Sequence, residues 1–179
     1  MTEDKLVEAC KRGQRQAQKE MYERFAGKMM AVCLRYTRNR EEAEDILQIG
    51  FVKVFTKINS YNGIGSLEGW VRKVIVNTAL ESFRKKNVLN GASDVTEINQ
   101  QGHVNWNPVE DEMNAKELIK IIQKLPDGFR TVFNLYAIEG YSHMEIAKQL
   151  NITEGTSKSQ YSRAKEWLRK KLIKEHLVF

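Results

Sequence analysis

Near the C-terminal end of the chain, hydroxyl and basic side chains gather on one side of a predicted helix. They are Lys158, Ser159, Ser162, Arg163 and Lys165. Arginine and lysine can donate to guanine edges in a DNA major groove, and hydroxyl groups can contact bases or phosphates. This pattern favours recognition of duplex DNA, although the spacing alone also fits an ordinary solvated helical hairpin.

Two short helices joined by a tight turn would position these side chains, within residues 140–172. Ser142 and Glu145 form an S-x-x-E capping box, which marks the start of the first helix. The turn is Asn151-Ile152-Thr153, and Thr153 is a candidate N-cap for the second helix. The first helix has an apolar side formed by Met144, Ile146, Ala147 and Leu150. The second helix has a core face formed by Tyr161, Ala164, Leu168 and Leu172.

A second candidate site is the loop at residues 59–65, which contains two glycines, two asparagines and Tyr61. The glycines allow unusual backbone angles and the close approach of another molecule. An aromatic side chain on such a loop can stack on an unpaired base, or it can simply cap the core. The run G-I-G-S-L-E-G is not a dinucleotide-binding loop, because its spacing is wrong and no strand precedes it.

The loop follows the helix with the clearest apolar periodicity, predicted over 41–58. Its core stripe has i, i+3, i+4 spacing and comprises Ala43, Ile46, Leu47, Gly50, Phe51, Val54, Phe55 and Ile58. Ile49 and Val52 lie off this stripe, beside polar residues. They predict either a surface for a partner protein or a wider buried stripe.

Four further helices complete the N-terminal half. Three precede the clear helix, over 3–11, over 16–25 or beyond, and over 28–37. A fourth follows the loop over 66–86, capped by Ser66. Its expected interior is Leu67, Trp70, Val71, Val74 and Thr78, and Gly69, Lys73 and Asn77 share another side.

The charge distribution divides the chain of 179 residues into three parts. Residues 1–86 carry a net charge of +6, residues 87–115 carry −5, and residues 116–179 carry +5. Two basic lobes around an acidic strip indicate a protein that touches a polyanion twice, although the same charge could serve only solubility. We therefore expect an all-α chain with two small helical domains, 1–86 and 115–179, joined by a flexible acidic linker at 87–114.

Composition also excludes several classes of protein. No apolar run approaches the roughly 18 residues of a membrane span, and no signal peptide is expected, which favours a cytoplasmic location. Cys10 and Cys33 are expected to be buried thiols. The histidines are scattered (His103, His143 and His176), so neither a zinc site nor any other cofactor is expected. No Walker loop, H-E-x-x-H or G-x-S-x-G motif is present, so we expect no enzyme activity.

Three passages resemble the bacterial sigma factors of the sigma-70 family, in the compact extracytoplasmic-function (ECF) group. EEAEDILQIGFVKVF is similar to the helix that docks on the clamp of RNA polymerase. SYNGIGSLEGWVRKVIVNTALESFRKKN resembles the segment that melts and reads the −10 promoter element. LPDGFRTVFNLYAIEGYSHMEIAKQLNITEGTSKSQYSRAKEWLRKKL resembles the −35-reading helix-turn-helix domain. Together they cover about residues 28–86 and 115–172.

The resemblance implies roles for residues on each surface. The polymerase clamp would meet Asp45, Gln48, Ile49 and Val52. The −10 element would meet Lys57, Tyr61, Asn62, Gly63, Lys73 and Asn77, with a flipped base in the Tyr61 loop. The −35 element would meet Thr156, Lys158, Ser159, Ser162 and Arg163. Core RNA polymerase, promoter DNA and an anti-sigma factor are the implied partners, and the linker would thread toward the polymerase active-site cleft.

Two positions depart from the family pattern. Ile49 stands where the family usually has an acid, which predicts a more apolar clamp contact. Ser157 stands where an aliphatic residue is frequent, which predicts looser packing at the start of the recognition helix. The alternative function is a stand-alone helix-turn-helix regulator, which would need a dimer face that the sequence does not display. A small nuclease or deaminase would need a metal-ligand or carboxylate cluster.

Overall fold

The computed structural model describes residues 1–89 and 115–174, and every regular element in these ranges is helical. The chain divides into two compact units, the N-terminal unit (Met1–Ser82) and the C-terminal unit (Phe83–Phe179). The expected all-α fold class is confirmed. The acidic linker predicted at 87–114 lies outside the described residues, apart from its first three positions, which continue helix α4.

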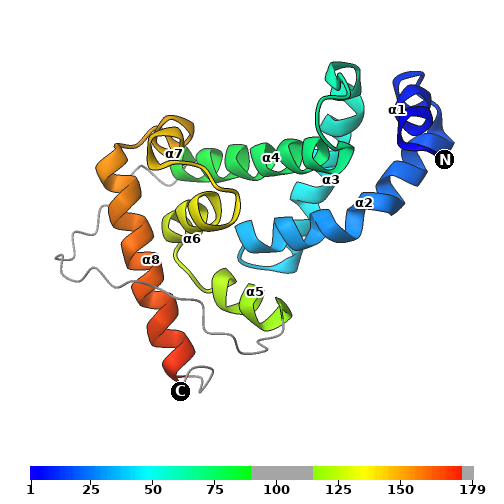
Figure 1. Cartoon of the computed structure of the whole chain (residues 1–179). Coiled ribbons are helices and arrows are strands. Elements are labelled where there is room, and N and C mark those ends of the chain that lie inside the picture. The colour runs from blue at the N-terminus through cyan, green and yellow to red at the C-terminus, as the bar shows by residue number, and fades with distance from the viewer. Residues whose placement is uncertain (90–114, 175–179) are drawn as a thin grey trace. The chain divides into compact units, whose positions relative to one another are not determined.

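Four α-helices and one 3-10 turn form the regular structure described in the N-terminal unit (Figure 1). They are α1 (Glu3–Lys11), α2 (Arg15–Tyr36), α3 (Arg40–Lys57), η1 (Ile58–Ser60) and α4 (Leu67–Leu89), which extends past the unit. Helices α2 and α3 pack together. Ion pairs join α4 to both of them: Lys28–Glu68 at 2.5 Å and Lys53–Glu81 at 2.5 Å. These three longer helices also supply most of the buried side chains described in the unit.

Helix α2 is continuous, so the prediction of two helices over 16–25 and 28–37 was wrong. Gly27 is exposed within it, and an interior glycine costs about 0.5–1 kcal/mol relative to alanine. The apolar stripe continues on both sides of this residue through Phe25, Met29, Val32 and Tyr36, all buried. Burial of each such side chain is worth about 1.5–3 kcal/mol, which outweighs the cost of the glycine.

Helix α3 closely follows its prediction. It begins after Asn39, whose side-chain oxygen accepts a hydrogen bond from the Glu42 amide at 2.9 Å. The predicted core stripe is buried except for Phe55, which is half-buried. Gly50 lies against α4, where a Cβ atom at this position would meet the Ile75 side chain.

Helix α4 begins one residue after Ser66, whose hydroxyl accepts from the Gly69 amide at 3.0 Å. It runs three residues beyond the predicted end at 86. Leu67, Val71 and Thr78 are buried as expected, while Trp70 and Val74 are half-buried. The interior also includes residues that the prediction omitted: Ile75, Val76, Ala79 and Leu80.

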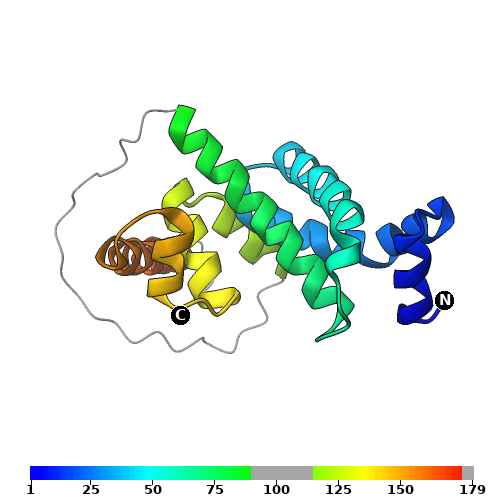
Figure 2. The ribbon, with the colours of Figure 1, turned by 90° about the horizontal axis from the view of Figure 1, so that it is seen from above.

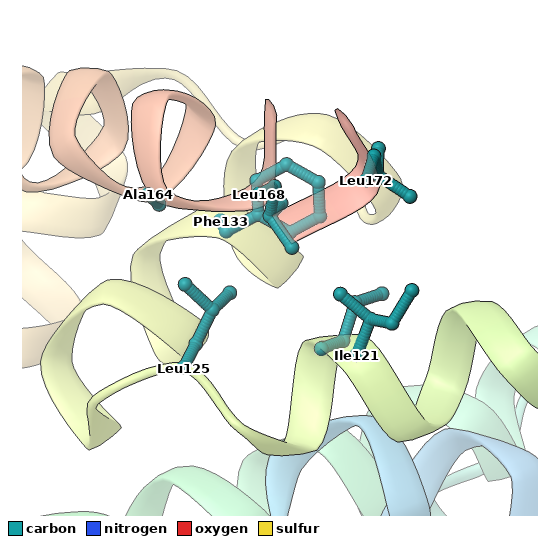
Figure 3. Close-up of a cluster of buried hydrophobic side chains, with 7 residues drawn as sticks. Ile121, Leu125, Phe133, Ala164, Leu168 and Leu172 are labelled. Carbon is teal, nitrogen blue, oxygen red and sulfur yellow. The ribbon is translucent and has the colours of Figure 1, made fainter. Parts of the chain in front are cut away.

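The described part of the C-terminal unit is built on a long final helix. Its elements are α5 (Ala115–Gln123), α6 (Asp127–Phe133), the π-helical turn η2 (Asn134–Ile138), α7 (His143–Leu150) and α8 (Glu154–Lys174). Helices α5, α6 and α7 all pack against α8. Residues of α5, α6, α8 and the turn before α6 form one buried cluster: Ile121, Ile122, Leu125, Phe133, Ala164, Leu168 and Leu172. Figure 3 shows this cluster, with all of these residues labelled except Ile122.

A buried arginine fixes the turn between α5 and α6. Arg130 is 3% exposed, and its Nη1 donates to the carbonyl oxygens of Gln123 at 3.0 Å and Leu125 at 2.8 Å. Its Nη2 pairs with the Asp127 carboxylate. These bonds satisfy carbonyl groups that the end of α5 leaves without helical partners. Neither this residue nor the short helices beside it had been predicted from periodicity.

The two cysteines are buried free thiols, as expected. Burial raises the pKa of the Cys33 thiol to about 12, so this thiol stays protonated at neutral pH. Within residues 1–89 and 115–174, no helix is both long enough and apolar enough to cross a bilayer.

Candidate nucleic-acid and protein interfaces

Hydrogen bonds at both helix starts fix the geometry of the helix-turn-helix. Ser142 and Glu145 form the predicted capping box, in which the Ser142 amide donates to the Glu145 carboxylate at 2.8 Å. Hydrogen bonds from Ser142 lower the pKa of that carboxyl group. Asn151 ends α7 in the left-handed conformation (φ 56°), and Thr153 Oγ1 accepts from the Thr156 amide at 3.0 Å. The predicted turn and N-cap are confirmed.

The five predicted −35 residues all lie on α8, and none of them is among its buried residues. Lys158 and Ser162 are exposed, and Thr156, Ser159 and Arg163 are half-buried. Lys158 Nζ lies 2.7 Å from the Glu154 carboxylate, so a DNA phosphate would have to compete with this ion pair. Lys165 is half-buried, with its ammonium 4.8 Å from the centre of the Tyr161 ring.

The expected looser packing at Ser157 was wrong. Ser157 is fully buried, and its Oγ lies 2.9 Å from His143 Nδ1 in a hydrogen bond. The imidazole also stacks on Tyr136, with ring centroids 4.2 Å apart and planes 11° apart. The buried Ser157 hydroxyl thus has a hydrogen-bond partner in His143.

The surroundings of His143 disfavour the protonated form of its imidazole. Burial is the main cause of its lowered pKa, the charge of Lys158 lowers the pKa further, and Glu154 opposes both. Sequence reasoning had treated this residue as one of three scattered histidines. The available signal was a serine on the core face of one helix, with a histidine at the start of the preceding helix.

The candidate base-binding loop follows η1. Gly63 (φ 77°) and Gly65 (φ 78°) both adopt left-handed backbone angles, as their residue type predicts. Tyr61 is half-buried, its hydroxyl donates to the Gly65 carbonyl at 3.0 Å, and its ring lies 5.6 Å from that of Trp70. The Asn62 side chain accepts from the Ile64 amide at 3.1 Å. The loop therefore has a defined shape.

The other predicted −10 residues are on the surface. Lys57, Asn62, Gly63, Lys73 and Asn77 are all exposed, and the last two lie one turn apart on α4. Sequence reasoning did not select Ile64, which is 81% exposed between the two glycines. An exposed aliphatic side chain held by a fixed turn can contact an unstacked base, so this residue adds an apolar tip to the loop.

The candidate protein interface is on α3. Ile49 is 52% exposed and Val52 is 62% exposed, and Asp45 and Gln48 are exposed beside them. All four lie on the side of α3 away from its buried stripe. The alternative of a wider buried stripe is therefore wrong for the chain by itself, and the apolar side chains are available to a partner.

Comparisons with known proteins identify the family to which the chain is similar. The family model described as sigma-70 region 2 matches residues 21–88, and the one described as sigma-70, region 4 matches residues 115–168. The chain is 31% identical to "ECF RNA polymerase sigma factor SigW" of Bacillus subtilis (strain 168), over 94% of this chain and 95% of that protein. It is 28% identical to the "ECF RNA polymerase sigma-E factor" of Haemophilus influenzae, over 96% of each.

A solved structure has a similar fold. It is the sigma factor RpoE in complex with the anti-sigma factor NepR from Bartonella quintana, with a TM-score of 0.50 and 21% identity. The match covers 85% of this chain and 94% of that one.

Proposed function

The chain belongs to the sigma-70 family of RNA polymerase sigma factors, in the extracytoplasmic-function group, and we propose residue-level roles for its three surfaces. Its function is that of a promoter-specificity subunit. It binds core RNA polymerase, recognises the −35 and −10 promoter elements and helps to melt the DNA. The chemistry of RNA synthesis belongs to the polymerase, so the sigma factor is not itself an enzyme.

The proposed polymerase contact is the face of α3 formed by Asp45, Gln48, Ile49 and Val52. The observation that supports it best is the exposure of Ile49 and Val52 beside two polar side chains. Burial of each aliphatic side chain on a partner is worth about 1.5–3 kcal/mol. This contact is the proposed anchor of residues 1–86, with residues 87–114 as the linker to a −35-reading domain at 115–179.

The proposed −10 surface consists of Lys57, Tyr61, Asn62, Gly63, Lys73 and Asn77. A flipped base would stack on the Tyr61 ring, while the two lysines would lie along the phosphates of the unpaired strand. The fixed shape of the loop supports this role, because its hydrogen bonds and glycine angles hold the ring in place before DNA arrives.

The proposed −35 surface consists of Thr156, Lys158, Ser159, Ser162 and Arg163 on α8. A helix that presents one basic and hydroxyl-rich face fits a major groove, and Thr156 near its start would meet phosphate. The N-terminal cap of α8 supports this role, because it keeps the first turn, which carries Thr156 and Lys158, in helical form.

An anti-sigma factor is a further proposed partner, on the model of the RpoE–NepR complex. It would cover the polymerase-binding face of α3 and thereby hold the sigma factor inactive. We also propose a cytoplasmic location, where polymerase and DNA are found. Cell fractionation would test the location, and recovery of the chain only in a membrane or secreted fraction would contradict it.

The polymerase contact predicts that Ile49→Asp with Val52→Asp leaves the fold intact and weakens the polymerase complex by about 100-fold or more, because apolar burial is lost and charge is desolvated. Co-elution with core polymerase measures this effect. The charge-change control is Lys73→Glu, on the proposed −10 surface of the same unit, which should keep normal polymerase binding. Normal co-elution of the double variant would contradict the proposed contact.

Gel-shift assays with and without core polymerase separate this function from a stand-alone regulator. A sigma factor of this kind should shift promoter DNA strongly only as holoenzyme. A stand-alone regulator would shift it equally well by itself.

A further inference from the structure

Helix α1 lies outside the segment that matches sigma-70 region 2, because that match begins at residue 21. A helix of nine residues is marginal in water on its own, so its order must come from docking on its neighbours. Four of its side chains are buried: Leu6 (0% exposed), Val7, Ala9 and Cys10. The family model for region 2 therefore says nothing about what this docked helix does.

The position of α1 suggests an answer. It packs against α2 and also against η1, the turn that leads into the proposed base-binding loop. Figures 1 and 2 both show α1 beside the turn between α3 and α4. Ile58, the first residue of η1, is only 1% exposed. Helix α1 thus contacts η1, the turn that precedes the Tyr61 loop.

Hydrogen bonds connect η1 to the Tyr61 loop. The Tyr61 amide donates to the Ile58 carbonyl at 3.0 Å, and the Ser60 hydroxyl donates to the Lys57 carbonyl at 2.7 Å. The Tyr61 hydroxyl then bonds to Gly65 and closes the loop. A shift of η1 would therefore move the Tyr61 ring and the loop that this ring closes.

We propose that α1 is a positioning element for the Tyr61 loop and that its docking tunes promoter opening. The proposal rests on the proposed −10 role of the loop. It assigns no DNA or polymerase contact to α1. A helix with this role should affect the opening of DNA while leaving the α3 contact with polymerase unchanged.

The first test needs no DNA. Leu6→Ala should weaken the docking of α1 and speed hydrogen exchange at the Tyr61 and Ile64 amides by about five-fold or more. The matched control is Leu80→Ala, the same truncation at a buried position of the same unit, about 20 Å along α4 from its first residue. NMR exchange rates report both amides, and the control should leave them within about two-fold of wild type.

The exchange result decides the structural half of the proposal. The proposal would be overturned if Leu6→Ala speeds hydrogen exchange of the α1 amides but leaves the exchange rates of the Tyr61 and Ile64 amides unchanged. Equal acceleration by Leu80→Ala would also overturn it, because the effect would then be general destabilisation. If Leu6→Ala does not fold, Val7→Ala makes a smaller cavity in the same helix and is judged by the same criteria.

The second test measures function in the holoenzyme. Leu6→Ala should slow open-complex formation by about three-fold or more, with polymerase affinity within about two-fold of wild type. Leu6→Met, which keeps the side-chain volume, should form open complexes at a rate close to that of wild type. Equal losses of opening and polymerase affinity would overturn the proposal. Tyr61→Ala serves as the reference: if it leaves opening unchanged, the −10 role of the loop fails, while the exchange experiment still decides whether α1 positions the loop.

Discussion

The two proposed DNA surfaces of this sigma factor are built in different ways. The −35 surface is one face of a continuous helix, α8, with Thr153 as its N-cap. The −10 surface is centred on a loop that two left-handed glycines and side-chain hydrogen bonds hold in place. A major groove accepts a preformed helix, whereas an unpaired base needs an aromatic or apolar surface to receive it.

The two surfaces also differ in the chemical groups that they offer to DNA. The −35 surface offers hydroxyl and basic groups, which read base edges and phosphates of an intact duplex. The −10 loop offers the Tyr61 ring and the exposed Ile64 side chain, which suit the flat faces of unstacked bases. We therefore expect changes in the loop to affect opening, and changes on α8 to affect sequence preference and salt dependence.

The largest effect that this comparison predicts is at Tyr61. Tyr61→Ala should reduce open complexes by about ten-fold or more, because base–aromatic stacking is worth about 1–3 kcal/mol, and closed complexes should form normally. Permanganate reactivity of −10 thymines at equal promoter occupancy measures this effect.

Tyr61→Phe is the matched control for this prediction. It keeps the ring but removes the hydroxyl that bonds to Gly65. Substantial opening by the phenylalanine variant would assign the effect to stacking. If Phe and Ala are equally defective, the hydrogen bond that closes the loop matters more than the ring. Unchanged thymine reactivity in Tyr61→Ala would mean that the loop does not receive an unpaired base, so the proposed difference between the two surfaces would be wrong.

Periodicity predicted the helices of this chain well where one apolar stripe faces one core. The bounds of α1 match the prediction, and α3 differs by one residue at each end. The break predicted near Gly27 did not occur, because burial on both sides outweighed the local propensity. Met144 was placed on the apolar side of α7 but is 57% exposed, since the short helix buries mainly Ile146 and Leu150.

The sites were predictable in part. The glycines of the loop and the off-stripe side chains of α3 follow from residue type and spacing. The pairing of His143 with Ser157 and the burial of Arg130 depend on contacts between separate elements, which helical spacing does not contain. The outward position of Ile64 depends on the left-handed glycines on either side of it, Gly63 and Gly65, which fix a direction that residue type alone leaves open.

The next effect concerns base reading on α8. Arg163→Ala should cost about 1–3 kcal/mol and relax the preference at one −35 position if the guanidinium contacts a base edge. The comparison variant is Lys170→Ala, farther along the helix, which should weaken all −35 sequences equally and reduce the salt slope by about one unit. Holoenzyme binding to a library of −35 variants at two salt concentrations separates the two. An unchanged preference and salt slope in Arg163→Ala would mean that another side of α8 faces the groove.

A smaller effect is expected from the ion pair at the start of α8. Lys158 pairs with Glu154, and this pairing lowers the pKa of the Glu154 carboxyl group. Glu154→Gln should release the ammonium for phosphate and remove a negative charge near the DNA, which should raise affinity for all −35 sequences by about two- to five-fold. Quantitative gel shifts of the holoenzyme measure this gain. Weaker binding would indicate that the carboxylate orients the lysine for DNA instead of competing with it.

The smallest predicted effect is on the stability of the C-terminal unit, through His143. Because its pKa is lowered in the folded state, the unfolded chain binds more protons as pH falls below about 6.5. The histidine therefore contributes stability at pH 7.5 that is lost as pH falls toward its folded pKa. The glutamates with lowered pKa on α7 and α8 titrate below 4.5, outside this window.

His143→Gln removes the titration along with the stacking on Tyr136, so the variant should be less stable than wild type at pH 7.5 and the gap should narrow by pH 5.5. Hydrogen exchange of the α7 and α8 amides in the full chain measures this gap for the C-terminal unit alone. Adding Glu154→Gln to the wild type removes the neighbour that raises the histidine pKa, so its stability should fall more steeply over the same range. A gap that widens toward pH 5.5 would mean that the protonated form of His143 is favoured in the fold.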